Sequence, residues 1–422
     1  MYFLCKISYN APHFNGFFCI NNIFYVILRL EQLQYDIKDM KKAIKLVGGL
    51  LVGSIIGFAI AFLLIWIIDG SEGLERAMHK DVNITKVIVS VACCLVSLVI
   101  TAILQFALHE TGHLLFGLAS GYKFSSIRVG KYALVKDDKG FHIRKFFIQG
   151  TGGQCIMTLP ADADTERVPY FWYNAGGVLV NIFLFALSAF ILMNFDLGMF
   201  GDAFFYMLAF TGAFIALLNG IPLSFNGLCN DGRNILLMWR DKRSRRFFLR
   251  IVQTAGGLAQ GKRPKDLPRE WFEDIPVDSP KDFFLMNNRI NYAALLEDLG
   301  QFDKARQVYE EISAFGKDVP GLLKLEIGAD HILMELLTTR RLDVVEQLYD
   351  KPLQDYIKST YKFSPTKNVA LYALALLRDN DTARAKQLLD EMESHSNNYL
   401  MPGEYLTAKF LMEQCDACSK TM

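Results

Sequence analysis

The chain has 422 residues, which is too long for one compact core and suits two or three structural units. Hydrophobic residues make up 52% of the sequence and charged residues 21%, a more apolar balance than soluble proteins of this length have. This content of apolar side chains excludes disorder as the main state, and a net charge of +1 does not indicate a nucleic-acid-binding protein. Composition therefore predicts a membrane protein that also carries a soluble part.

The N-terminal region reads as an extension followed by the true start of translation. Residues 1–39 mix polar and aromatic residues without a clear period, whereas Met40, Lys41 and Lys42 precede a long apolar run, as is typical of a bacterial start. We expect translation to begin at Met40 and residues 1–39 to be a start-site artefact. A cleaved signal peptide fits less well, because the apolar run is long and no small-residue cleavage site follows it.

Four stretches are apolar over the ~20 residues that a helix needs to cross a bilayer. We expect membrane-spanning helices near residues 46–68, 87–119, 173–193 and 203–223. Lysine and arginine concentrate before the first span, between the second and third, and after the fourth. Because basic loops stay on the cytoplasmic side, the sequence predicts a multi-pass protein of the bacterial cell membrane with both termini cytoplasmic.

The second predicted span ends in a His-Glu-x-x-His pattern formed by His109, Glu110 and His113. Histidines four residues apart lie on one face of a helix, so both imidazoles can bind one Zn²⁺. Glu110 lies beside them and can take a proton from water that the metal has made more acidic. Ionisable residues inside a spanning helix are costly, and this location favours a functional role over a chance pattern.

A catalytic zinc site needs a third protein ligand, and water completes the tetrahedron. Asp231 is the candidate, because it follows the fourth span and that span runs in the same direction as the second, which places both motifs on one membrane side. The alternative is that Asp231 caps the N-terminus of the next helix. Asn226, Cys229 and Asn230 are the other possible ligands.

Between the second and third spans, residues 126–135 and 141–148 read as a β-hairpin around a polar turn. The edge of such a hairpin offers backbone groups with which an unwound substrate strand can pair. The alternative is a hairpin that only covers the membrane face of the protein. Proline scanning of residues 141–148 distinguishes the two.

The C-terminal third is predicted to be cytosolic and helical. Residues 241–280 read as a basic, Pro/Gly-rich linker, and residues 281–422 as a helical domain with a weak repeat of 40 residues that relates Gly300, Arg340 and Asn380. Each unit reads as helix, tight turn, helix and looks like a tetratricopeptide unit. A plain α-helical bundle is the alternative. Either arrangement offers a surface for a protein or peptide partner.

The membrane part resembles the site-2 protease family of intramembrane zinc metalloproteases over about residues 87–240. The His-Glu-x-x-His pattern carries the resemblance first. The stretch Gly150–Cys155 is similar to the family's membrane-dipping segment. Three further features follow in the family's order: Gly177-x-x-x-Asn181, the pair Asn219 and Pro222, and Asp231-Gly232. The interval from Asn219 to Asp231 is longer than in the family, and no PDZ-like module follows the active helix.

The resemblance implies hydrolysis of a peptide bond in a membrane-anchored protein or peptide. It implies Zn²⁺ as the cofactor, with His109, His113 and Asp231 as ligands and Glu110 as the general base. It also implies that Asn181 helps to stabilise the oxyanion, and the alternative for Asn181 is a hydrogen bond between helices.

The overall prediction is a mainly α, polytopic membrane protein with about four transmembrane helices. It has a metalloprotease domain at residues 40–240, with a short β-hairpin between the second and third spans, and a helical repeat-like domain after the linker. One alternative is a metal-free membrane-anchored adaptor whose tail binds protein partners. The other is a zinc hydrolase that acts on a non-peptide substrate.

Overall fold

A computed structural model describes residues 84–137, 140–145, 152–160, 162–164, 167–225, 228–280 and 282–420. The first predicted span and residues 1–39 lie outside these residues. The described part is mainly helical and includes a small antiparallel sheet. The chain divides into two compact units, one with residues 84–105 and 181–214 and the other with the rest of the described chain.

Three helices of the described chain are long and apolar enough to cross a membrane: α4 (Ile84–Ala119), α5 (Tyr170–Asn194) and α6 (Gly198–Gly220). They confirm the second, third and fourth predicted spans as apolar helices. α6 begins at Gly198 rather than residue 203, because Gly198 adopts a φ of 70° that makes a short turn after α5 possible. It ends before Pro222, which has no backbone N–H to continue a helix.

In the first unit, side chains of α4 pack against α6. Cys94 and Leu98 contact Ala203 and Met207 in a small buried cluster. Apolar side chains on the other faces of these helices are exposed, as is typical of helices that meet lipid.

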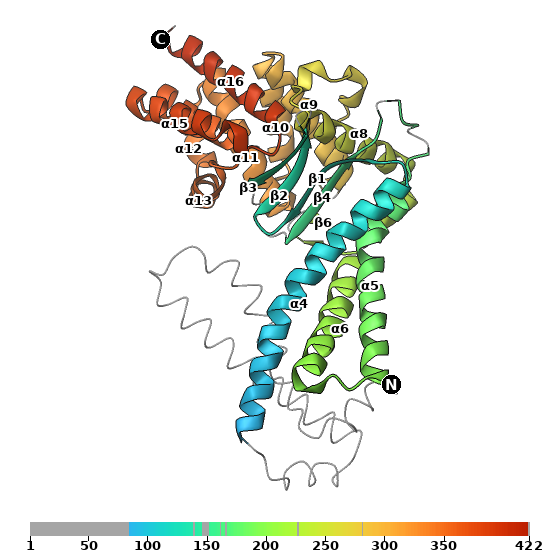
Figure 1. The fold of residues 1–422 in the computed structure, drawn as a ribbon. Coiled ribbons are helices and arrows are strands. Elements are labelled where there is room, and N and C mark those ends of the chain that lie inside the picture. Colours follow the sequence, from blue (N-terminus) through green and yellow to red (C-terminus); the bar gives the residue numbers. More distant parts are fainter. Residues whose placement is uncertain are drawn as a thin grey trace. The chain divides into compact units, whose positions relative to one another are not determined.

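A four-stranded antiparallel sheet belongs to the second unit (Figure 1). Its order is β3-β2-β1-β4, with β1 (Lys123–Val129), β2 (Tyr132–Asp137), β3 (Gly140–Lys145) and β4 (Gly153–Thr158). The predicted hairpin accounts for only part of this sheet. Residues 126–135 do not form one strand, because Gly130 turns the chain with a φ of 58° between β1 and β2. β4 comes from the Gly-rich stretch and pairs with β1, so the element is a sheet.

The segment predicted as a linker contains the amphipathic helix α8 (Lys242–Ala259). Asp241 caps it by accepting hydrogen bonds from the backbone N–H groups of Arg243 and Ser244. Phe247 and Leu249 are buried in a cluster that includes residues of β4 and α9. The basic residues therefore belong to a packed helix, and residues 242–259 of the predicted linker form α8. Two short 3₁₀ turns follow at Pro264–Asp266 and Arg269–Trp271.

Residues 282–420 form a helical domain. Its helices are α9 (Phe283–Asp298), α10 (Phe302–Ser313), α11 (Gly321–Leu337), α12 (Leu342–Leu348), α13 (Lys351–Thr360), α14 (Pro365–Ala373, continued by a π-helical turn at Leu374–Arg378), α15 (Thr382–Ser394) and α16 (Pro402–Lys420). Gly300, Arg340 and Asn380 all have a positive φ, of 70°, 54° and 54°. The three positions related by the 40-residue spacing therefore make the same kind of turn.

The helical domain packs against one face of the sheet within the second unit. Ala133 and Val135 of β2 are fully buried in a cluster with Leu400 and Met401, which precede α16. The guanidinium of Arg144 on β3 donates a hydrogen bond to the carbonyl of Tyr399. These contacts join the soluble domain to the sheet.

Candidate metal centre

Three side chains from two separate segments meet in the second unit. The Nε2 atoms of His109 and His113 lie 3.1 Å apart, and the Oδ2 atom of Asp231 lies 3.2 Å from the first and 3.4 Å from the second. His109 and His113 are buried, and Asp231 is partly buried. We call this group the metal triad. The prediction that Asp231 joins the two histidines is confirmed as a geometry.

The spacing of the metal triad fits a tetrahedral metal. Zinc binds histidine nitrogen and carboxylate oxygen at about 2.0–2.2 Å, and two ligands at a tetrahedral angle are then about 3.3–3.6 Å apart. The three distances in the triad, 3.1, 3.2 and 3.4 Å, lie at the lower end of this range or within 0.2 Å below it. Asp231 Oδ2 is also buried without a hydrogen bond of good geometry, which is costly unless a cation or proton satisfies it.

The orientation of His113 is set by a backbone carbonyl. Its Nδ1 atom lies 2.7 Å from the carbonyl oxygen of Tyr173 in α5, and a carbonyl can only accept, so Nδ1 carries the proton. Nε2 of the neutral ring then points its lone pair at the triad. The hydroxyl of Tyr173 donates to the carbonyl of Cys155 in β4, which ties this support to the sheet.

Asp231 is free to face the histidines because its neighbour caps the helix. Asn230 is the N-cap of α7 (Asp231–Arg240), and its side-chain oxygen accepts from the N–H of Arg233. Its amide also donates to the carbonyls of Leu218 and Ile221 at the end of α6. The alternative in which Asp231 itself caps the helix is wrong, since a side chain engaged in the cap could not also reach the imidazoles.

The contacts of Asn230 also explain the long interval between Asn219 and Asp231. Strands β5 (Ser224–Phe225) and β6 (Leu228–Cys229) form a small hairpin in this interval. At its base the N–H of Asn230 donates to the carbonyl of Leu223, and the N–H of Leu223 donates to Asn230 Oδ1. The extra residues loop out and return the chain to the same point. Cys229 lies by Ser224, and Asn226 is outside the described residues.

Glycines let the backbone approach these side chains. A Cβ atom at Gly177 of α5 would lie 2.6–2.7 Å from ring atoms of His109, and one at Gly153 of β4 would lie 2.4 Å from Glu110 Oε1. A Cβ at Gly232 would lie 2.2 Å from the carbonyl oxygen of Gly220. Any larger residue would therefore displace an imidazole, the Glu110 carboxylate or the start of α7.

The electrostatics of Asp231 keep its carboxyl ionised. Burial alone would raise the pKa of this carboxyl, but in the metal-free protein the positive charge of the protonated His113 and His109 imidazoles lowers that pKa to about 2. Asp231 is therefore a carboxylate at neutral pH, which is the form that binds a metal. Among the described residues, its ion pairs are with the two histidines.

Asn181 takes part in a contact between helices. It is fully buried in the first unit, and its amide donates to the backbone oxygen and to the side-chain oxygen of Gln105. The amide of Gln105 in turn donates to the carbonyl of Leu208 in α6. This is the interhelical hydrogen bond foreseen as the alternative, and the oxyanion role of Asn181 stays a prediction.

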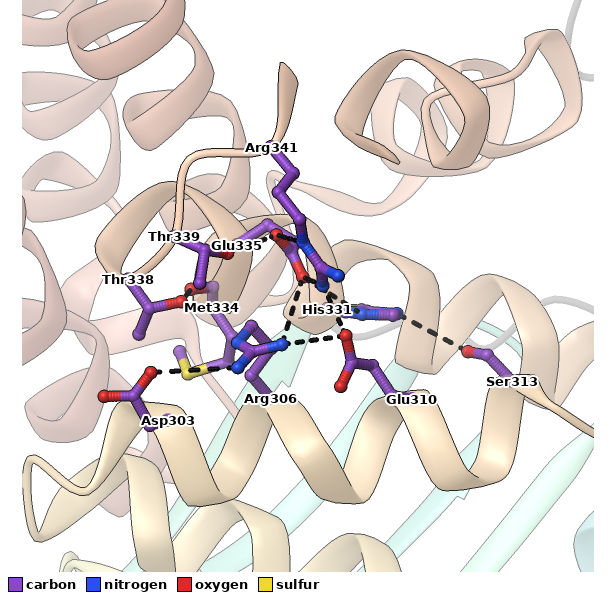
Figure 2. A network of polar contacts seen from close by, with 10 residues as sticks. All are labelled: Asp303, Arg306, Glu310, Ser313, His331, Met334, Glu335, Thr338, Thr339 and Arg341. Atoms are coloured by element: carbon purple, nitrogen blue, oxygen red, sulfur yellow. Dashed lines mark hydrogen bonds and ion pairs between the residues drawn. The ribbon is translucent and has the colours of Figure 1, made fainter. Parts of the chain in front are cut away.

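A second group of histidine and carboxylates lies in the helical domain. Glu310, His331 and Glu335 place their ligand atoms within 4.8 Å of one another. Figure 2 shows that two arginines join them: Arg306 donates to Glu310 over 2.8 Å, and Arg341 donates to Glu310 and Glu335. We call these five residues the ion-pair cluster. The guanidinium groups already neutralise both carboxylates, so the cluster does not suit a metal cation.

Three supporting roles escaped the sequence analysis: those of Gln105, of Tyr173, and of Asn230 as a cap. Only Gln105 carried a local signal, because it is an uncharged polar residue within an apolar span, four residues before His109. The others act through backbone carbonyls or close approach, which depend on residues distant in sequence.

A scan against protein-family models, a search of curated proteins and a search of solved structures found no match to this chain. The resemblance to site-2 proteases therefore stays a prediction from the sequence motifs.

Proposed function

We propose that this protein is a zinc-dependent intramembrane endopeptidase that hydrolyses a peptide bond of a membrane-anchored protein or peptide. The observation that carries the proposal is the metal triad, in which three ligand atoms from α4 and from the start of α7 lie at the spacing of a tetrahedral site. His109, His113 and Asp231 would hold the zinc ion. The site-2 protease family remains the family to which we assign this chemistry.

Each group of the chain has a definite part in the proposed reaction. When bound, zinc supplies Lewis-acid polarisation of a carbonyl and makes water a stronger acid. Glu110, one residue from His109, takes the proton of the attacking water and passes it to the nitrogen of the leaving amine. The Tyr173 carbonyl keeps the His113 ring in the tautomer that the metal needs.

The depth of the site fits cleavage near a membrane surface. A helix rises about 1.5 Å per residue, so ~20 residues counted from Val89 span the ~30 Å of hydrocarbon and end near His109. The basic loops support the assignment of this end to the cytoplasmic face of a bacterial membrane. A substrate peptide bond at this depth lies at the boundary between hydrocarbon and water, where water can reach it.

The sheet is the proposed contact for an unwound substrate strand. β3, expected to take this part, lies at one edge, whereas β4 at the opposite edge places Gly153 against Glu110. Adjacent strands are about 4.8 Å apart, so β3 lies ~14 Å from β4 across the sheet. Strand addition beside β4 would bring a substrate closer to Glu110 than addition beside β3.

The helical domain is the proposed recruitment module. Its three turns with matching backbone conformation support a tetratricopeptide-like array, which binds a protein or peptide partner along its surface. We assign it to the cytosol with the C-terminus.

Glu110→Gln tests the reaction. Purified protein in detergent or lipid is mixed with a model membrane-anchored peptide, and fragments are quantified by mass spectrometry. Loss of the general base should lower the cleavage rate by about 10²–10⁴-fold while the zinc content of the variant stays at the parent level. Glu346→Gln, at an exposed position of α12, is the matched control and should cleave normally.

Other outcomes assign a different function. Parent protein without zinc, with the same partners captured by the helical domain, would make it a metal-free adaptor. Zinc-loaded protein that cleaves no peptide but loses activity on another ester or amide after Glu110→Gln would make it a hydrolase of a non-peptide substrate. Full peptide cleavage by Glu110→Gln would contradict the mechanism.

A further inference from the structure

The start of β4 lies along one face of α4. A Cβ atom at Gly152 would lie 3.1 Å from the ring of Phe106, and one at Gly153 would lie 2.4 Å from Glu110 Oε1. Phe106 and Glu110 are four residues apart and therefore share a face of the helix. The backbone of residues 152 and 153 forms a wall beside the Glu110 carboxylate, so the position of this wall limits where the carboxylate can lie.

A buried arginine fastens this wall to the rest of the sheet. Arg128 of β1 is 2% exposed, and its guanidinium donates to the carbonyl of Gly130 over 2.6 Å and to the carbonyl of Gly153 over 3.1 Å. The N–H of Gly130 in turn donates to the carbonyl of Gly152 over 2.8 Å. The turn between β1 and β2 is thus joined to the start of β4 through Arg128.

The choice of a charged residue at this position has a cost. A guanidinium loses its hydration when it is buried, and only good hydrogen bonds offset that loss. Pairing of β1 with β4 does not need the charge, because strands pair through their backbone groups. Arg128 adds two charge-assisted bonds at the end of this pairing, and its planar guanidinium can hold both carbonyls at once. The bonds act where the sheet contacts α4.

We propose that Arg128 is a positioning residue for Glu110: it holds the backbone of Gly153 against α4 and so keeps the Glu110 carboxylate beside the metal triad. The inference rests on the proposed function, in which Glu110 is the general base. A base must lie within hydrogen-bond reach of the proton that it takes, and a displacement of about 1 Å can cost about 10²-fold in rate. Release of the wall would give Glu110 other rotamers without removing a ligand of the metal.

The native thiol of Cys155 reports whether β4 stays in place. Cys155 lies two residues after Gly153, its side chain is buried, and burial raises the pKa of its thiol, so it reacts slowly while the strand is packed. Full-length protein in detergent or lipid is treated with N-ethylmaleimide, and the labelled peptides are quantified over time by mass spectrometry. We expect Arg128→Met to label Cys155 at least about tenfold faster than the parent. Cys415, fully buried in α16, should keep its parent rate, which excludes global unfolding.

Cleavage kinetics and zinc content then separate positioning from folding. Arg128→Met should lower kcat for a model membrane-anchored peptide by about 10²-fold, while KM and zinc content stay at the parent level. Arg128→Lys keeps the charge but cannot hold both carbonyls in the same way, so it should recover part of kcat. This variant also carries the comparison if Arg128→Met does not fold.

Arg263→Met is the matched control for a loss of stability. Arg263 donates to Asp298 Oδ1 over 2.7 Å in the segment that follows α8, and Asp298 is buried. This variant should lower Tm and leave both the labelling of Cys155 and kcat at the parent level. The same fall in kcat in Arg263→Met would overturn the proposal, since a general loss of stability would then explain the effect of Arg128→Met.

Two further results would overturn the proposal. Parent-like labelling of Cys155 in Arg128→Met would show that the start of β4 does not depend on the arginine. Fast labelling with a parent kcat would show that Glu110 does not depend on β4. A parent protein that cleaves no peptide would instead count against the endopeptidase function, and the labelling comparison would still decide whether Arg128 holds β4.

Discussion

The metal triad and the ion-pair cluster contain the same kinds of side chain, yet they differ in the charge around them. In the triad one carboxylate, Asp231, faces two imidazoles and has a buried oxygen without a hydrogen bond. In the ion-pair cluster two carboxylates face two guanidinium groups. A cation bound at the triad would lie among one carboxylate and two imidazoles, whereas a cation at the cluster would have to displace arginine.

The difference teaches that proximity of histidine and carboxylate is not enough to indicate a metal. Both groups lie within the distance that metal ligands share. The deciding features are the charge of the groups that face each carboxylate, the backbone support of His113, and a capping residue that leaves the Asp231 carboxylate free. Four predictions test whether this contrast holds, and they begin with the largest expected effect.

Removing a triad ligand should abolish zinc binding. Asp231→Ala or His109→Ala should weaken zinc binding by at least about 100-fold, because each removes a direct ligand of the metal rather than a residue that only supports a ligand. Metal content of purified protein, measured by mass spectrometry of the element, reports the change. His331→Ala in the ion-pair cluster is the control and should keep the parent zinc content. A fall in zinc with His331→Ala alone would reverse the assignment of the two groups.

Removing the cap should weaken zinc binding less than removing a ligand. Asn230→Ala frees the N-terminus of α7 and lets Asp231 compete for the cap, so we expect a loss in zinc affinity of about 10–100-fold. Competition with a fluorescent chelator measures the affinity. Asp241→Ala removes the cap of α8 and should destabilise the protein without changing zinc affinity. Equal affinities for Asn230→Ala and parent would show that the cap does not position Asp231.

Disrupting the ion-pair cluster should affect stability and leave the metal site intact. Glu335→Gln removes the charge that Arg341 and Arg306 share, and its side chain is fully buried. We expect a loss of about 1–3 kcal/mol in the free energy of unfolding of the helical domain, seen in thermal or denaturant unfolding. Lys351→Gln breaks an exposed pair with Asp355 and should cost only ~0.3–0.5 kcal/mol. Similar losses for both variants would contradict a structural role for the cluster.

The ion-pair cluster should also respond to pH through His331. Burial lowers the pKa of His331, and the nearby Glu335 and Glu310 offset this only in part, while Arg341 and Arg306 add to it. A histidine with a lowered pKa binds fewer protons in the folded state than in the unfolded state. Its contribution to stability is therefore complete above pH ~6.5 and is lost as the pH falls below that value, with a slope of at most ~1.4 kcal/mol per pH unit.

His331→Gln measures this contribution. The stability difference between pH 7.5 and pH 5.5, from denaturant unfolding at each pH, should be smaller in the variant than in the parent. His395→Gln, at the partly buried C-terminal end of α15, removes a different histidine and serves as the comparison. An unchanged difference in His331→Gln would assign the pH response to other groups.

Much of the candidate site could be predicted from the chain alone, because its elements are local. Histidines at positions 109 and 113 share a helix face by the geometry of any α-helix. The apolar length of the spans and the recurrence of the turn at residues 300, 340 and 380 are equally local properties. The direction of the spans was enough to predict that Asp231 reaches the membrane side of the histidines.

Other features depended on which distant groups compete for the same partner. Asn230 and Asp231 are both good capping residues, and only the contacts of Asn230 with the end of α6 decide that Asn230 caps and Asp231 faces the imidazoles. Likewise β4 joins the sheet, rather than remaining a loop, because it pairs with β1. Local sequence determined the chemistry available to this protein, whereas hydrogen bonding and packing between remote segments decided which side chain carries it, because each buried polar group must find one partner among several.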